Sequence, residues 1–124
     1  MTSEVTFPEM RNEVIAALRS FSDPVHQATR WGRWEEGVNY YDDLTLNVNT
    51  LYDDCQVLPS PESAVPDVLL EADVPALRAL DNALGPMIRD LGNRPDTDYL
   101  ADPRWPTVVA AAQAALDAMD AQPC

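Results

Sequence analysis

The sequence predicts an all-α protein, a single-domain orthogonal bundle of about five helices with a Pro-rich central loop. Hydrophobic residues recur at spacings of three and four along most of the chain, which is the period of an amphipathic helix. Two Asp-Pro pairs mark expected helix starts. The 124 residues, of which 46% are hydrophobic, suffice for one core. We therefore expect one domain over residues 1–124, with N-terminal helices in 7–55, a loop at 56–66 and C-terminal helices in 74–120.

The first helix is expected to begin within the segment from Thr6 to Glu9. A hydroxyl followed three residues later by a glutamate has the spacing of a capping box. Pro8 suits the first turn, because the N–H group that it lacks has no helical partner there. Five apolar residues then fall on one face at helical spacing: Met10, Val14, Ala17, Leu18 and Phe21.

A second helix is expected to follow Asp23, whose side chain is the predicted N-cap. The Asp-Pro pair also ends the first helix, because a residue before proline disfavours the helical backbone conformation. The second helix should continue to about Glu36, just before a glycine. Its predicted inward residues are Val25, Ala28 and Trp31.

The third helix is expected to be capped by Asp42 or Asp43. A rival pattern alternates apolar residues at positions 44, 46 and 48, as in a strand. The helical pattern runs longer, and the sequence offers no second strand-like run as a pairing partner, so we predict a helix. Its apolar positions are Leu44, Val48, Leu51, Tyr52 and Cys55.

The C-terminal half follows a loop in which prolines and serines gather between residues 56 and 66. Asp73 is the predicted N-cap of a fourth helix that ends at Gly92. An apolar stripe runs along this helix, and Pro86 is expected to kink it or to break it into two short helices. The members of the stripe are Val74, Leu77, Leu80, Leu84, Ile88 and Leu91.

The last helix is expected after a loop with one helical turn near residues 98–100. Asp102 is its predicted cap, and Pro103 occupies the first helical position. The alanine-rich middle of this helix should allow close approach to a neighbouring helix. Its predicted buried face comprises Trp105, Val108, Val109, Ala112, Leu116 and Met119.

Charge is the most unusual property of the composition. The chain has 21 acids against eight bases, all of them arginine, and a formal net charge of −13. This charge argues against binding of nucleic acid or of an anionic membrane surface, and favours a basic protein partner or simply solubility. The first five residues lack the features of a signal peptide, and no apolar run is long enough to span a bilayer. We therefore expect a cytoplasmic protein.

No pattern of catalytic residues is found in the sequence. The acid pairs Asp42-Asp43 and Asp53-Asp54 lie eleven residues apart, so on one helix they would be about 16 Å apart, too far to hold one metal ion. There is no nucleophile motif and no Gly-rich phosphate loop. Cys55 lies on an apolar stripe without a basic neighbour, which indicates a core residue. We expect no enzyme activity, no metal and no cofactor.

The segment from Trp31 to Trp34 is the best candidate for recognition, because Trp and Arg are enriched in binding hot spots. Aromatic and acidic residues follow it closely along the chain. The alternative interpretation places both tryptophans in the core and the arginines in internal salt bridges. The predicted partner-binding residues are Trp31, Arg33, Trp34, Tyr40, Tyr41, Asp42, Asp43, Asp53 and Asp54.

Six segments carry a resemblance to known proteins: residues 11–18, 31–33, 41–44, 51–54, 57–59 and 100–105. Together they resemble a family of small, uncharacterised, all-helical actinobacterial proteins, and the resemblance covers nearly the whole chain. These segments mark a fold and carry no catalytic signature. In size, acidity and helicity the chain is also similar, by analogy only, to immunity proteins of bacterial toxin systems.

Four functions are consistent with these features. The leading hypothesis is an acidic cytoplasmic binding protein of immunity or inhibitor type, which neutralises a basic protein such as a toxin or nuclease through charge-steered association. One alternative is a phage-type mimic of nucleic acid that blocks a DNA-binding enzyme. Another is a small metal-dependent nucleotide hydrolase, which requires three or four acids in one pocket. The last is a structural or regulatory domain that forms a homodimer through an apolar helix face.

Overall fold

The computed structural model describes residues 5–31 and 43–120, and within them it is an all-α bundle with no β-strand. The predicted fold class is therefore confirmed. The described α-helices are α1 (Pro8–Phe21), α2 (Pro24–Arg30), α3 (Leu44–Asn49), α4 (Val74–Leu91), α5 (Asp96–Ala101) and α6 (Trp105–Asp120). The shorter helical elements are η1 (Thr50–Asp54), η2 (Pro61–Ala64) and η3 (Glu71–Asp73).

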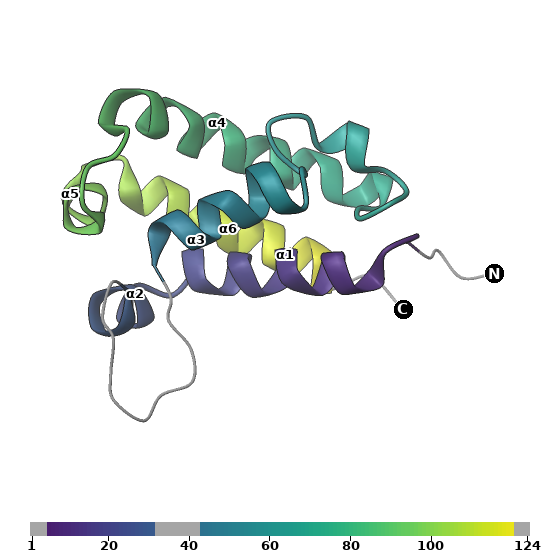
Figure 1. Cartoon of the computed structure of the whole chain (residues 1–124), viewed down its shortest axis with the longest axis horizontal. Coiled ribbons are helices and arrows are strands. Elements are labelled where there is room, and N and C mark those ends of the chain that lie inside the picture. Colours follow the sequence, from purple (N-terminus) through teal and green to yellow (C-terminus); the bar gives the residue numbers. More distant parts are fainter. Residues whose placement is uncertain (1–4, 32–42, 121–124) are drawn as a thin grey trace.

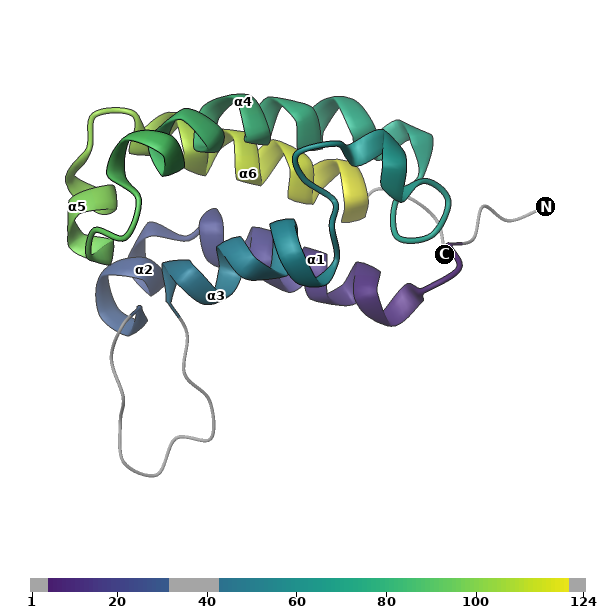
Figure 2. The ribbon, with the colours of Figure 1, turned by 45° about the horizontal axis from the view of Figure 1, so that its top comes forward.

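The three longest helices, α1, α4 and α6, run along the long axis of the molecule (Figure 1). Helix α6 packs against both α1 and α4. Helix α3 continues directly into η1, and this pair lies beside α1, as a second view confirms (Figure 2). The short helices α2 and α5 lie at the same end of the bundle in both views.

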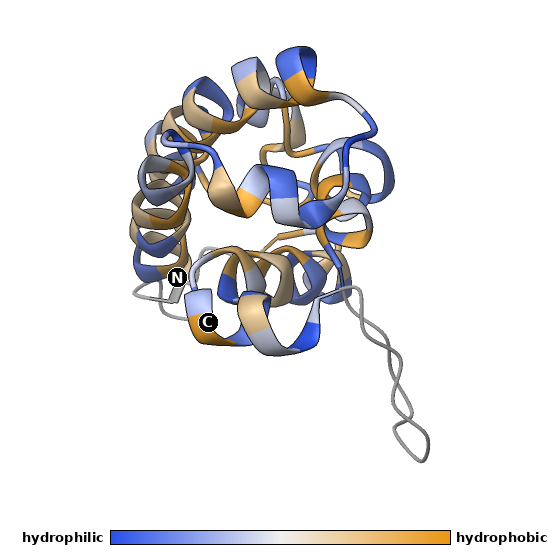
Figure 3. Cartoon of the chain, turned by 90° about the vertical axis from the view of Figure 1, so that its left-hand side faces the viewer, coloured by the Kyte–Doolittle hydropathy of each residue, from blue (hydrophilic) through white to orange (hydrophobic). Residues whose placement is uncertain are grey.

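One hydrophobic core fills the space between these helices. The predicted apolar faces of the first, fourth and last helices all contribute to it, and Figure 3 shows hydrophobic and hydrophilic positions alternating along the ribbons, as amphipathic helices require. The largest side chains with no exposed surface include Val14, Leu18, Phe21, Leu51, Leu77, Leu80, Leu84, Met87 and Val108.

The central loop is more structured than its proline content indicated. It forms η2, and the segment that joins it to α4 forms η3. Residues 56–73 contribute five buried hydrophobic residues to the core: Val57, Leu58, Ala64, Val68 and Leu69. The chain before α1 is bound to it, because the Thr6 and Phe7 N–H groups donate to the carbonyl oxygens of Pro66 (3.2 Å) and Asp67 (2.7 Å). The loop is therefore part of the single domain.

The predicted capping box of α1 is wrong. The N-cap is Phe7, and no side chain caps this end of the helix. The Thr6 N–H group is instead bonded to the central loop, which holds Thr6 one residue outside the cap position. The prediction of Pro8 in the first turn is confirmed.

Helix α2 differs most from its prediction. Asp23 is the N-cap, as expected, and accepts a hydrogen bond from the His26 N–H group at 3.1 Å. However, the helix ends at Arg30, six residues early, and Val25 is 72% exposed. Gln27 is buried in its place, because its amide donates to the carbonyl oxygens of Ser20 (2.9 Å) and Phe21 (2.8 Å). Ala28, another predicted inward residue, is also exposed.

The third helix matches its prediction. Asp43 is the N-cap of α3, and its carboxylate accepts from the Leu46 N–H group at 2.7 Å. The other candidate cap, Asp42, lies outside the described residues. All five predicted apolar positions are buried or half-buried, with Cys55 at the end of the stripe.

The predictions for the start and the middle of α4 are only partly confirmed. Asp73 is the N-cap residue, as predicted. Asp73 makes no side-chain cap to α4, because its carboxylate is buried against Arg11 of α1. The helix also continues without a break through Pro86. The carbonyl four residues earlier, which loses its donor, belongs to exposed Asn82, so water can bind it. Gly92 ends the helix with φ +53°, as predicted.

The last helix begins at Trp105, two residues later than predicted. Asp102 turns its carboxylate to Arg104 and accepts from both its backbone N–H group (2.9 Å) and its guanidinium. The predicted buried face of α6 is nevertheless confirmed, with only Val109 half-buried.

Candidate functional site

The predicted partner-binding residues separate into two groups. Trp31, Asp43, Asp53 and Asp54 are described by the structure. The other five lie outside the described residues: Arg33, Trp34, Tyr40, Tyr41 and Asp42. The structural account of the site therefore rests on the first group and on the residues that the fold brings beside it.

Trp31 belongs to the aromatic core, and only 5% of its surface is exposed. Its ring meets those of Phe21 and Trp105 edge to face, with centroid separations of 5.8 Å in both cases. Its indole N–H group donates to the Ser20 hydroxyl at 2.7 Å. Trp31 is therefore a core residue, as the alternative interpretation of the sequence holds, and it has little exposed surface with which to contact a partner.

A network of buried polar side chains surrounds these aromatic rings. The sequence analysis did not predict it, because it identified buried positions from the spacing of hydrophobic residues. Asn47 donates to the Ser20 hydroxyl (3.3 Å) and to the Asp43 carbonyl oxygen (2.7 Å). Gln27 accepts from the indole N–H group of Trp105 at 2.9 Å. Because buried polar groups need partners, this network fixes the relative positions of α1, α2, α3 and α6.

Asp53 and Asp54 are exposed at the end of η1. The fold brings two glutamates of α1 to the same surface: the Cys55 thiol is 3.6 Å from the Glu13 carboxylate, and Glu9 lies one helical turn from Glu13. We call these four exposed acids, Glu9, Glu13, Asp53 and Asp54, the α1–η1 acidic surface. Within the described residues, none of the four forms an ion pair with an arginine.

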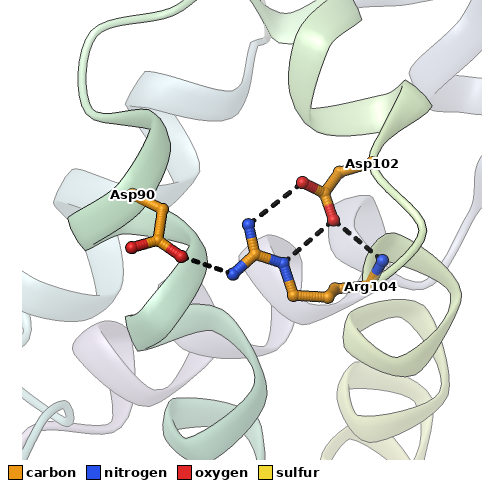
Figure 4. A network of polar contacts seen from close by, with 3 residues as sticks. All are labelled: Asp90, Asp102 and Arg104. Atoms are coloured by element: carbon orange, nitrogen blue, oxygen red, sulfur yellow. Dashed lines mark hydrogen bonds and ion pairs between the residues drawn. The ribbon is translucent and has the colours of Figure 1, made fainter.

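The arginines with described ion pairs are bound to other acids. Arg104 joins the end of α4 to the start of α6, because its guanidinium donates to Asp90 (2.7 Å) and to both carboxylate oxygens of Asp102 (2.9 and 3.0 Å) (Figure 4). Hydrogen bonds from the Arg104 side chain and backbone lower the pKa of Asp102. Further pairs join Arg78 to Glu62, Arg94 to Asp98 and Arg11 to Asp73. None of these described ion pairs includes an acid of the α1–η1 acidic surface.

Cys55 lies beneath this surface, and burial raises the pKa of its thiol from 9.0 to about 12, with a further increase from Glu13 and Asp54. The folded state therefore holds the thiol proton at pH values where the unfolded chain releases it. This stabilisation is complete below pH 9.0 and is lost as the pH rises toward 12. We expect the unfolding free energy to fall more steeply over this range than in Cys55→Ala, as denaturant titrations at several pH values would measure. Parallel pH profiles of the two proteins would contradict this assignment.

The described residues contain no group of three His, Cys, Asp or Glu side chains placed to hold a metal ion. A metal-dependent nucleotide hydrolase requires such a group. The described part of the chain also contains no helix with the length and apolar character needed to cross a membrane.

Comparison with known proteins identifies the family. Neither the curated proteins nor the solved structures include a match to this sequence. One family model, in contrast, matches residues 5–124, which include every described helix. The chain therefore belongs to the family described as a domain of unknown function, DUF7945.

Proposed function

We propose that this protein is an acidic binding protein of immunity or inhibitor type, which docks on a basic protein such as a toxin or nuclease. The observation that carries the proposal is the α1–η1 acidic surface. Its four acidic residues are exposed and form no described ion pair with an arginine. The arginines with described ion pairs bind acids elsewhere in the protein. The net charge of −13 also favours association with a basic partner.

Uncompensated surface carboxylates favour a basic partner for a physical reason. Charge complementarity accelerates association and excludes partners of like charge, although exposed pairs add little affinity. Salt screens such interactions over about 8–10 Å at 0.1–0.15 M ionic strength. Binding at this surface should therefore weaken markedly as salt is raised.

Two features of the proposed protein are supported by the sequence alone. One is its cytoplasmic location, and the other is partner contact through Arg33, Trp34, Tyr40, Tyr41 and Asp42. Of the predicted acids that the structure describes, Asp53 and Asp54 are the better candidates for contact, because the Asp43 carboxylate is engaged in capping α3.

The test is capture of a basic protein from the native cell lysate at low and high salt, followed by calorimetric titration with the purified partner. We expect Asp53→Lys/Asp54→Lys to abolish binding, because it replaces two negative charges on the α1–η1 acidic surface with positive ones. Circular dichroism should show an unchanged fold, since both side chains are exposed.

A matched control is Asp67→Lys/Glu71→Lys, which changes the net charge by the same amount at two other exposed acids. This variant should retain most of the affinity. Equal loss in both variants would mean that only the total charge matters, and no loss in either would refute docking at this surface.

A further inference from the structure

Arg11 lies on α1 but points into the protein, and only 7% of the residue is exposed. Its guanidinium reaches three segments that are distant in sequence. One terminal nitrogen donates to the Asp73 carboxylate (2.6 Å) and to the Val68 carbonyl oxygen (3.3 Å), and the other donates to the Met119 carbonyl oxygen (3.3 Å). We call these four residues, Arg11, Val68, Asp73 and Met119, the Arg11 junction.

Asp73 is fully buried within this junction. The carboxylate oxygen that pairs with Arg11 also accepts from the Leu70 N–H group at 2.8 Å. The other oxygen has no hydrogen-bond partner in the described part of the chain. The carboxylate thus depends on Arg11 for most of its stabilisation, because a buried charge without a partner is very costly.

The segment that carries Val68 and Asp73 has little secondary structure of its own. Between η1 and α4 the only regular elements described are the short helices η2 and η3. The described backbone hydrogen bonds of residues 68–73 are all local: Val68 and Leu69 donate to the Ala64 carbonyl oxygen, and Asp73 donates to that of Leu70. Such a segment depends on contacts with other parts of the bundle to stay closed. The last turn of a helix also tends to open, because its final carbonyl oxygens have no intrahelical donor.

We propose that the Arg11 junction is a conformational latch that makes residues 68–73 and the last turn of α6 open as one unit. If residues 68–73 move away, the guanidinium loses its buried counter-ion and must be hydrated. Its hydration breaks the bond to Met119, so the end of α6 is released in the same event. This coupling does not depend on the binding partner or on the α1–η1 acidic surface.

Native-state hydrogen exchange of the whole chain at increasing denaturant concentrations tests the latch. In the unsubstituted protein, amides in residues 68–73 and 116–119 should share one opening free energy and one denaturant dependence. In Arg11→Lys, a single ammonium group keeps the charge beside Asp73 but cannot span both carbonyl oxygens. Residues 116–119 should then exchange about tenfold faster than residues 68–73, as expected for the loss of one charged hydrogen bond.

Leu44→Ala is the matched control, because it removes a buried side chain from α3 that takes no part in the hydrogen bonds of the Arg11 junction. In this variant the two segments should keep equal opening free energies. Different opening free energies in the unsubstituted protein would overturn the proposal. An Arg11→Lys variant in which the two segments still open together would also overturn it.

Discussion

Replacement of Asp73 with alanine is expected to lower the free energy of unfolding by about 3–5 kcal/mol, the range measured when one partner of a buried ion pair is removed. Arg11 would remain buried without its counter-ion, and the Leu70 N–H group would lose its acceptor. Denaturant unfolding followed by circular dichroism measures this loss. A decrease below about 1 kcal/mol would mean that water reaches Arg11 in the variant and that the pair is not effectively buried.

Two control variants separate the ion pair from other effects. Glu71→Ala removes an exposed acid two residues away and should change stability by no more than about 0.5 kcal/mol. Arg11→Met/Asp73→Asn leaves no charge in the junction, while the side-chain amide introduced at position 73 can still accept from the Leu70 N–H group. This double variant should be more stable than Asp73→Ala, because no unpaired charge stays buried.

Replacement of Trp105 with alanine should cost about 3–5 kcal/mol, as is usual for a large aromatic residue in a core. Trp105 packs against Trp31 and Phe21, with ring centroids 5.8 and 6.2 Å away, and is 5% exposed. Its removal would also leave the Gln27 carbonyl oxygen without the indole donor in the polar network. Thermal and denaturant unfolding of the variant would measure the loss.

Trp105→Phe is the informative comparison for this site. Phenylalanine keeps an aromatic ring but cannot donate to Gln27, so the cost should combine a smaller cavity with an unpaired buried acceptor, about 1–3 kcal/mol for the latter. If Trp105→Phe is as destabilising as Trp105→Ala, the hydrogen bond to Gln27 outweighs the packing of the ring. If Trp105→Ala costs less than about 1 kcal/mol, Trp105 does not have the role in the core that its burial indicates.

Part of the candidate site could be predicted from the sequence. Asp53 and Asp54 were predicted as partner-binding residues, which requires exposed side chains, and both are exposed. Glu9 and Glu13 could not be assigned to the same surface, because their proximity to η1 depends on how α1 packs against it. Trp31 was predicted both to face inward on the second helix and to contact a partner, and only the packed structure shows that it is buried.

The sequence by itself determined the features that depend on neighbours within about one helical turn. These are the buried faces of α1, α3, α4 and α6, the cap at Asp23, the presence of a cap at Asp42 or Asp43, and the helix end at Gly92. The physical reason is that helical period and capping geometry are local properties of the chain.

Only the tertiary structure decided which polar side chains turn inward. Asp73 has the residue type and position of a helix cap, but its partner Arg11 is 62 positions away, and the buried pairing prevails. Gln27 replaces Val25 on the inner face of α2 because its amide meets carbonyl oxygens of α1 and the indole N–H group of Trp105, 78 positions away. Such partners compete with local preferences, since an unpaired polar group in the core costs more than a helix cap contributes.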